Sequence, residues 1–181
     1  MPRRRETPRL EGERVRLEPM RWEHLPGLLA AASDERIWRL MNARLQRRED
    51  LVGWLQAALD LQEKGTAMPW VTVLRGSDRV VGATRLMDLE WGHGTAELGN
   101  TWLTPEVQGS GINTECKLLQ LRFGFEELGL RRIAFKTHHE NLRSQAALRK
   151  LGAVYEGTFR NHYVMPDGSQ RHSVWFSITR E

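Results

Sequence analysis

The stretch Gln108-Gly109-Ser110-Gly111-Ile112-Asn113 has the residue types of an anion-binding turn. It follows a strand-like run, residues 96–103, and the helix breaker Pro105, and it precedes the helical pattern Thr114–Leu128. The first N–H groups of a helix have no intrahelical partner, and the helix dipole is positive there. Glycine lets the backbone come close to a ligand and adopt positive φ. The pattern therefore favours an anion at this turn, with a plain connecting loop as the alternative.

Four further polar residues have types and positions that suit acid–base chemistry. Asn141 is a good N-cap, and Ser144 lies three residues later, so both project from the same side of a helix start. Glu97 sits in the middle of a strand-like run, and His138, with an ordinary pKa of about 6.5, ends another. Each also has a structural interpretation: a cap, a first-turn serine, an ion-paired glutamate and a strand-end histidine.

Neither a metal site nor a cysteine nucleophile is expected. His138-His139-Glu140 would offer ligands, but adjacent strand residues point apart and the chain has no further Cys/His cluster. Cys116 falls among leucines on the helix after the glycine turn, with no triad partners in sequence.

The elements that must position these residues follow from hydrophobic period and turn residues. Expected helices cover Glu23–Ala32, Asp34–Met41, Arg48–Lys64, Thr114–Leu128 and Asn141–Leu151. Expected strands cover Glu13–Pro19, Trp70–Leu74, Arg79–Leu89, Thr95–Leu103, Arg131–His138, Val154–Met165 and Gln170–Thr179. This order predicts an α/β (α+β) fold with a mixed sheet and helices on its faces.

Composition fits a globular protein: 181 residues, of which 40% are hydrophobic and 28% charged. Residues 1–9 are expected to form a disordered basic lead before one domain, residues 10–181, and no apolar run approaches a membrane span. A single cysteine fits a reducing cytoplasm. The net charge of +4 would suit nucleic acid, but several arginines lie in the lead, so nucleic acid is the less favoured partner.

An ordered set of motifs resembles the GNAT acyl-CoA N-acyltransferases, and within them the RimJ/RimL-like branch. The resemblance covers roughly residue 10 to the end. The residues that carry it are Ala96–Gly99, Thr101–Pro105, Gly109–Glu115, Lys117–Leu119, Arg132–Thr137, Asn141–Gln145, Lys150–Ala153, Glu156–Arg160 and Asp167–Gly168.

The match has departures. The phosphate loop of the family reads Gln/Arg-x-x-Gly-x-Gly/Ala, and Asn113 takes its last position here. Asn100 stands where relatives tend to have an aromatic residue, and His172 where they tend to have an acid. Position 100 lies near the expected acceptor groove, so this departure concerns specificity rather than coenzyme A binding.

The resemblance implies a central, mostly antiparallel sheet of about seven strands with four or so helices, and acetyl transfer from acetyl-CoA to a primary amine. The acceptor would be an N-terminal α-amine or a small-molecule amine, attacking directly in a ternary complex, without a metal. The expected CoA-binding residues are Thr101, Trp102, Leu103, Gln108, Gly109, Ser110, Gly111, Ile112, Asn113, Thr114, Asn141 and Ser144.

The resemblance also suggests roles. Ser144 would act as general acid, Glu97 or His138 as base, and Trp38, Trp54 and Asn100 would line the acceptor side. A homodimer is possible. Another donor, such as succinyl-CoA, stays open, because Arg85 or Arg160 would read an acidic acyl tail. A CoA-binding regulatory domain without catalysis is the alternative from another class.

Overall fold

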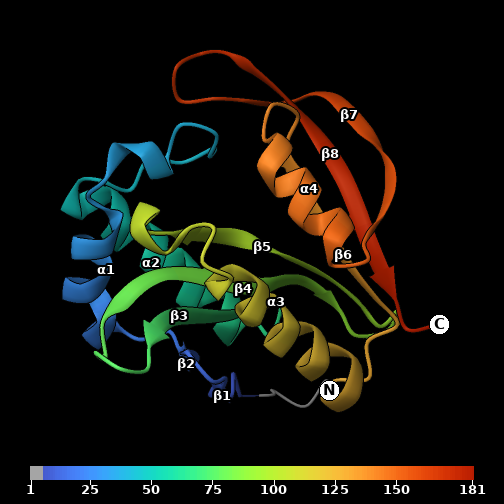
Figure 1. Cartoon of the computed structure of the whole chain (residues 1–181), viewed down its shortest axis with the longest axis horizontal. Helices are drawn as coiled ribbons and strands as arrows, with labels where there is room; N and C mark the ends of the chain where they lie inside the picture. The colour runs from blue at the N-terminus through green and yellow to red at the C-terminus, as the bar shows by residue number, and fades with distance from the viewer. Residues whose placement is uncertain (1–5) are drawn as a thin grey trace.

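The computed structural model describes residues 6–181. Over this part of the chain, eight strands form one sheet in the order β1-β2-β3-β4-β5-β6-β8-β7 (Figure 1). All neighbouring pairs are antiparallel except β5 and β6, which are parallel. The strands are β1 (Leu10–Glu11), β2 (Val15–Pro19), β3 (Met68–Leu74), β4 (Val80–Glu90), β5 (Thr95–Leu103), β6 (Arg132–His138), β7 (Val154–Val164) and β8 (Gln170–Thr179). The α-helices are α1 (Leu25–Ala32), α2 (Arg48–Glu63), α3 (Ile112–Arg122) and α4 (Leu142–Lys150). The predicted fold class is confirmed.

Two hydrophobic cores lie on opposite faces of the sheet. Trp70 and Val71 are adjacent on β3 and enter different cores, because successive strand residues point to opposite faces. One core joins the sheet to α3 and α4, and the other joins it to α1 and α2. The second core also holds Trp38 and Trp102.

The parallel pair β5–β6 separates part-way along its length. Its ladder runs from Thr95–Arg132 to Glu97–Ala134, although β5 continues to Leu103 and β6 to His138. Figure 1 shows the two strands diverging beyond this point. A β-bulge falls within the diverging part of β5, where Asn100 has a φ of 50° and the register with β4 shifts. The sheet is therefore open between the C-terminal ends of β5 and β6. The glycine turn follows the end of β5 along the chain.

Two helix starts at this opening have clear local causes. Gly111, with φ 90°, is the N-cap of α3, a left-handed conformation that suits glycine. Asn141 caps α4 with its side-chain oxygen, which accepts a hydrogen bond from the backbone N–H of Ser144. Both helices thus begin where β5 and β6 have separated.

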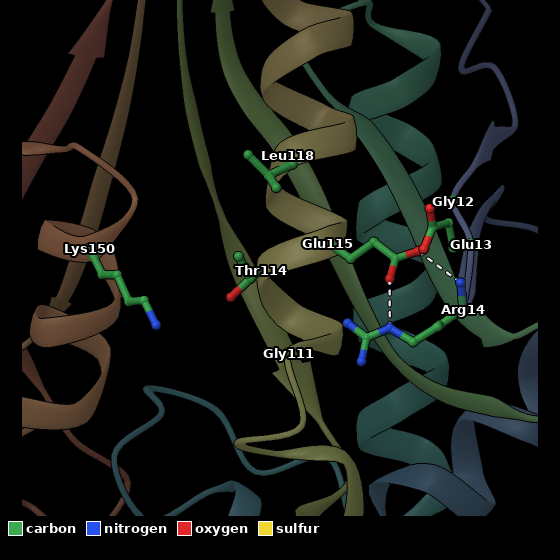
Figure 2. Close-up of a pocket in the computed structure, with 8 residues that line it drawn as sticks. All are labelled: Gly12, Glu13, Arg14, Gly111, Thr114, Glu115, Leu118 and Lys150. Atoms are coloured by element: carbon green, nitrogen blue, oxygen red, sulfur yellow. Dashed lines mark hydrogen bonds and ion pairs between the residues drawn. The ribbon is translucent and has the colours of Figure 1, made fainter.

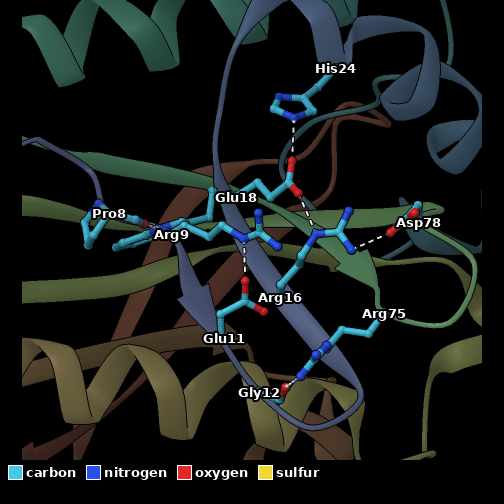
Figure 3. A network of polar contacts seen from close by, with 10 residues as sticks. Pro8, Arg9, Glu11, Gly12, Arg16, Glu18, His24, Arg75 and Asp78 are labelled. Atoms are coloured by element: carbon cyan, nitrogen blue, oxygen red, sulfur yellow. Dashed lines mark hydrogen bonds and ion pairs between the residues drawn. The ribbon is translucent and has the colours of Figure 1, made fainter.

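Charged residues alternate with buried hydrophobic residues along β2. Figure 3 shows Glu18 between His24 and Arg16, and Arg16 also reaches Asp78. The hydrogen bond from Arg16 Nε to Glu18 is 2.5 Å long, and it holds the pKa of Glu18 below its usual value. These ion pairs fix the N-terminal edge of the sheet, away from the β5–β6 opening.

Some element boundaries differ from the predictions. The expected helix Asp34–Met41 is reduced to a 3₁₀ turn, Glu35–Ile37, followed by turns. The reason is local: Asp34 caps this turn, and the Trp38 indole donates to the Ala32 carbonyl. The helix after the glycine turn starts at Ile112 rather than Thr114 and continues as a π-helical segment, Phe123–Glu127.

The short strand β1 was not predicted. It pairs with β2 through Leu10–Leu17 and Glu11–Arg16. Of the expected basic lead, residues 1–5 lie outside the described residues. Thr7 is buried, and the Pro8 carbonyl accepts a hydrogen bond from the Trp70 indole. These contacts hold residues 7 and 8 against the sheet.

Candidate functional site

The glycine turn and the first turn of α3 border a cavity of about 610 Å³. Figure 2 shows the cavity between α3, the segment before β2, and α4, from which Lys150 extends. The lining residues are Gly12, Glu13, Arg14, Gly111, Thr114, Glu115, Leu118 and Lys150. A helix N-terminus with a cavity and two basic side chains beside it suits an anionic ligand.

Arg14 fixes the geometry of this turn. Its Nη1 donates to the Ser110 carbonyl at 2.9 Å, and its Nε donates to Glu115 at 3.0 Å. Glu115 also accepts from the backbone N–H of Arg14 at 2.9 Å. Burial raises the pKa of Glu115, but these bonds to Arg14 outweigh burial and leave its pKa below the usual value. A guanidinium is therefore held against the glycine turn by residues a hundred positions away.

Gln108 connects the turn to both sides of the opening. Its Nε2 donates to the Leu103 carbonyl at 2.9 Å, and its Oε1 accepts from Arg143 at 2.6 Å. The side chain therefore joins the end of β5 to α4 rather than lying free in solvent. A direct contact of Gln108 with coenzyme A stays a prediction.

The open edge of β5 carries the residues expected along the pantetheine. Trp102 and Leu103 are buried, and Thr101 forms a 2.8 Å hydrogen bond with Thr84 through its side-chain oxygen. Beyond Glu97 the ladder with β6 has ended, so this backbone edge has no β6 partner. An extended chain can add to such an edge as a strand does.

Across the opening, the start of α4 presents Asn141 and Ser144. The Asn141 Oδ1 caps the helix through the Ser144 N–H at 3.1 Å. Within residues 6–181, Ser144 Oγ has no hydrogen-bond partner. The cap role of Asn141 is thus established, and the serine hydroxyl is free to meet a ligand.

Glu97 lies buried at the point where β5 and β6 separate. Its Oε2 accepts a 2.8 Å hydrogen bond from Lys136 on β6, while its buried Oε1 has no partner. Burial raises the pKa of Glu97, and the Lys136 charge only partly offsets this. Burial lowers the pKa of the less buried Lys136, but its bond to Glu97 outweighs burial and leaves the pKa raised. The cation that pairs with Glu97 is thus Lys136.

His138 ends β6 and is buried. Its Nδ1 accepts from the Glu140 backbone N–H at 3.1 Å. Burial, followed by the charges of His139 and Arg171, lowers its pKa, so the ring is neutral at pH 7. The sequence argument that His138 and His139 point apart is wrong: β6 ends at His138, and the two rings stack with centroids 4.4 Å apart. Among the residues described here, no group of three or more potential ligands could hold a metal ion.

The residues expected on the acceptor side form an aromatic cluster. Trp38 is buried and packs against Trp102, with ring centroids 5.2 Å apart. Trp54 on α2 meets the Trp102 ring edge-on at 6.2 Å. Asn100 is half-buried at the bulge, with its amide near the Met87 sulfur. Trp38 has a packing role, and substrate contact by the three residues stays a prediction.

The comparisons with known proteins agree with this geometry. A family model described as an acetyltransferase (GNAT) domain matches residues 14–154. The chain belongs to the GNAT acetyltransferase family. Family membership makes the protein an acyl-CoA-dependent N-acetyltransferase, which takes an acyl-CoA and an amine acceptor.

Individual relatives match this GNAT protein along most of its length. An uncharacterized N-acetyltransferase of Bacillus subtilis, YoaA, is 24% identical over 174 residues, 96% of this chain and 97% of the relative. A GCN5-related N-acetyltransferase from Brucella melitensis has a TM-score of 0.86 and 29% identity, covering 97% of this chain and 80% of the other. A structure of the ribosomal-protein acetyltransferase RimL with coenzyme A has a TM-score of 0.81 at 17% identity, which shows the shared fold alone.

Sequence reasoning missed two residues of this GNAT site. Arg14 was not among the candidate site residues, and Lys136 entered only as part of the family motif Arg132–Thr137. Arg14 and Lys136 form ion pairs with partners distant in sequence. The one available signal was Glu97 in a strand, because a carboxylate there needs a cation.

No helix in residues 6–181 is long and apolar enough to cross a membrane.

Proposed function

We propose that the protein transfers an acetyl group from acetyl-CoA to a primary amine, either an N-terminal α-amine or a small-molecule amine. The observation that carries the proposal is the opening between β5 and β6 with the glycine turn and the N-terminus of α3 beside it. The turn, Gly109 to Thr114, would receive the pyrophosphate of the coenzyme. The thioester arm would then run along the open edge of β5.

In this arrangement the backbone of Thr101, Trp102 and Leu103 pairs with the pantetheine as an added strand. One of these N–H groups polarises the thioester carbonyl and stabilises the oxyanion of the tetrahedral intermediate. Asn141, whose oxygen caps α4, offers its amide N–H₂ to the pantetheine.

The reaction is a direct attack. The amine nitrogen bonds to the thioester carbonyl carbon, the C–S bond breaks, and coenzyme A leaves as a thiolate. The ammonium proton of the adduct passes to a base, and Ser144 Oγ, directly or through water, gives a proton to the thiolate and regains one from solvent water, so that it acts as a relay. Its unengaged hydroxyl supports this role. Cys116 is buried, and burial raises its pKa to about 12, which argues against a cysteine nucleophile.

Glu97 is the preferred base. Its raised pKa and unpartnered buried Oε1 suit a carboxylate that collects a proton, either directly or through a water. His138 is the second candidate, because it is neutral at pH 7 and ends β6 close to Asn141.

The site should prefer weakly basic amines as acceptors, because less free energy is needed to deprotonate them. An α-amine has a pKa of about 8, so about a tenth of it is already neutral at pH 7. A lysine amine, with a pKa of about 10.4, costs about 4–5 kcal/mol to deprotonate at that pH. N-terminal α-amines and small amines of low pKa are therefore the better acceptors for this site.

The test is thiol release from acetyl-CoA with a panel of amines and N-terminal peptides, alongside CoA binding by calorimetry. Gly111→Phe would place a bulky ring beside Arg14 in the cavity, and CoA binding should be lost. Gly111→Ala is the matched control, because it carries the same left-handed strain without the bulk. Unchanged CoA affinity in Gly111→Phe would refute the placement of the coenzyme. Binding of CoA without turnover of any amine would favour a non-catalytic CoA-binding domain.

A further inference from the structure

Arg85 on β4 is a buried cation without a counterion. Arg85 is only 4% exposed, and neither its Nε nor its Nη2 has a hydrogen-bond partner. No acidic residue in the described part of the chain forms a salt bridge with it. Its guanidinium lies over the Trp54 ring, 4.8 Å from the centroid. Burial lowers its pKa to about 10, so it remains charged at neutral pH.

A second unpartnered donor lies in the same cluster. The Trp102 indole Nε1 is buried and has no acceptor. Trp54 contacts both residues, with the guanidinium over its ring and Trp102 meeting it edge-on. Buried donors are nearly always satisfied in folded proteins, and an unpaired buried charge is especially costly. These unpaired hydrogen-bond donors lie on the side of the sheet where the amine substrate is expected. We therefore infer that a bound ligand supplies the atoms that accept their hydrogen bonds.

The geometry of the unpaired donors indicates which chemical group the ligand carries. Nε and Nη2 form one edge of the guanidinium, the fork that binds the two oxygens of a carboxylate side by side. Two other cations of the sheet have side-chain hydrogen-bond partners: the half-buried Lys136 bonds to Glu97, and the buried Arg171 donates through Nε to Ser173. One free guanidinium offers one positive charge, which matches a carboxylate better than a phosphate.

The unpartnered Oε1 of Glu97 lies on the same face of the sheet. Arg85 pairs with Gly99 and Met87 pairs with Glu97, so Arg85 and Glu97 are diagonal neighbours on one face. A Cβ at Gly99, the residue paired with Arg85, would lie 2.8 Å from Met87 Cε and 2.9 Å from Glu97 Oε1, so the absence of a side chain at Gly99 makes room for both of these groups. An unpaired carboxylate oxygen and an unpaired guanidinium on one face are complementary to a molecule that carries an amine and a carboxylate.

We propose that Arg85 binds a carboxylate of the substrate, and that the acceptor is an amine that itself carries a carboxylate, such as an amino acid. The proposal rests on the acetyl transfer proposed above and specifies its acceptor. The amine would lie toward Glu97 and the carboxylate on the Nε–Nη2 edge of Arg85. A carboxylate on the acyl group, as in succinyl-CoA, is the other source of the same chemistry.

The test compares each standard amino acid with its own carboxamide as acceptor, in the wild type, Arg85→Met and Arg85→Lys. Arg122→Met, which replaces an exposed arginine at the end of α3, is the matched control. In each protein, kcat/KM for the acid is divided by kcat/KM for the amide, and comparing this acid-over-amide ratio between wild type and variant cancels the different amine pKa values. Arg85→Met should lower the acid-over-amide ratio about 30-fold or more, Arg85→Lys should lower it less, and Arg122→Met should leave it unchanged.

A second set of assays identifies whether the carboxylate that Arg85 binds belongs to the acceptor or to the acyl group. With acceptor amides, succinyl-CoA is compared with acetyl-CoA in the same variants. A selective loss with succinyl-CoA would place the carboxylate on the acyl group, whereas a selective loss with amino acids places it on the acceptor. If Arg85→Met lowered kcat/KM equally for acid and amide acceptors, and equally for succinyl-CoA and acetyl-CoA, the proposal of a carboxylate site would be refuted.

A third readout needs no turnover, so failure of acetyl transfer would not obscure it. In the ligand-free protein, Arg85→Met should raise the melting temperature, because it removes an unpaired buried charge and keeps an unbranched chain on Trp54. Amino acids should raise the melting temperature of the wild type more than their amides do, and Arg85→Met should abolish the difference. A lower melting temperature in Arg85→Met, with no acid–amide difference in the wild type, would show that Arg85 serves packing alone.

Discussion

Replacement of Glu97 by glutamine removes the proposed base with the least structural change. Glutamine keeps a side-chain oxygen that can still accept the hydrogen bond from Lys136, 2.8 Å away in the native pair. It cannot accept the proton of the attacking amine. General base catalysis contributes about 10²- to 10⁴-fold. We therefore expect kcat to fall by that factor, about 2.7–5.4 kcal/mol of transition-state stabilisation.

The pH profile gives the sharper signature. Burial raises the pKa of Glu97 above its ordinary value, and the base works only when deprotonated. Wild-type kcat/KM should therefore rise with pH through the raised pKa, and activity should be lost as the pH falls through it. Glu97→Gln should abolish this acidic limb. The KM for acetyl-CoA should stay unchanged, because the coenzyme is bound by the glycine turn and the edge of β5.

The assay is thiol release from pH 4.5 to 9, with melting temperatures to show that each variant is folded. Glu156→Gln is the matched control: Glu156 pairs with Arg132 at the surface of the C-terminal half of the sheet, and its loss should change kcat less than about twofold. Full activity and an intact acidic limb in Glu97→Gln would refute the reasoning. If a His138 variant then lost that limb, His138 would be the base.

Four other outcomes are expected. Gly111→Ala should lose about 1–2 kcal/mol of stability, read as a lower melting temperature, since its φ is 90°. Gly53→Ala, with open space around an exposed position of α2, should gain up to about 1 kcal/mol in urea unfolding. Asn141→Ala should cost about 1 kcal/mol in the same measurement through loss of the α4 cap, and should also raise the KM for acetyl-CoA. Cys116 should resist thiol reagents in the native state, because its pKa is raised to about 12.

Much of the donor side could be predicted from the sequence because its determinants are local. A glycine turn before a helix and an asparagine at a helix start are short-range signals, and both are where the sequence placed them. The mixed sheet followed from strand and helix periods. The separation of β5 from β6 has no signal in the sequence pattern, since no local pattern marks where a ladder ends.

The acceptor side could not be predicted in the same way. Trp38 and Trp54 are alike in sequence, yet one is buried with its indole bonded and the other lies partly buried over Arg85. The ion pairs Arg14–Glu115 and Glu97–Lys136 are brought together by the fold, because their members lie far apart along the chain. Long-range pairing decides which charges are satisfied, and so which ones, like Arg85, are left for a ligand.

The most direct test of the account is a crystal structure with coenzyme A. We expect the pyrophosphate at the N-terminus of α3, within hydrogen-bond distance of the backbone N–H groups of residues 109–114. The pantetheine should lie between β5 and β6, with its thiol near Ser144. A coenzyme bound elsewhere on the sheet, with the β5–β6 opening filled by protein side chains, would contradict the account.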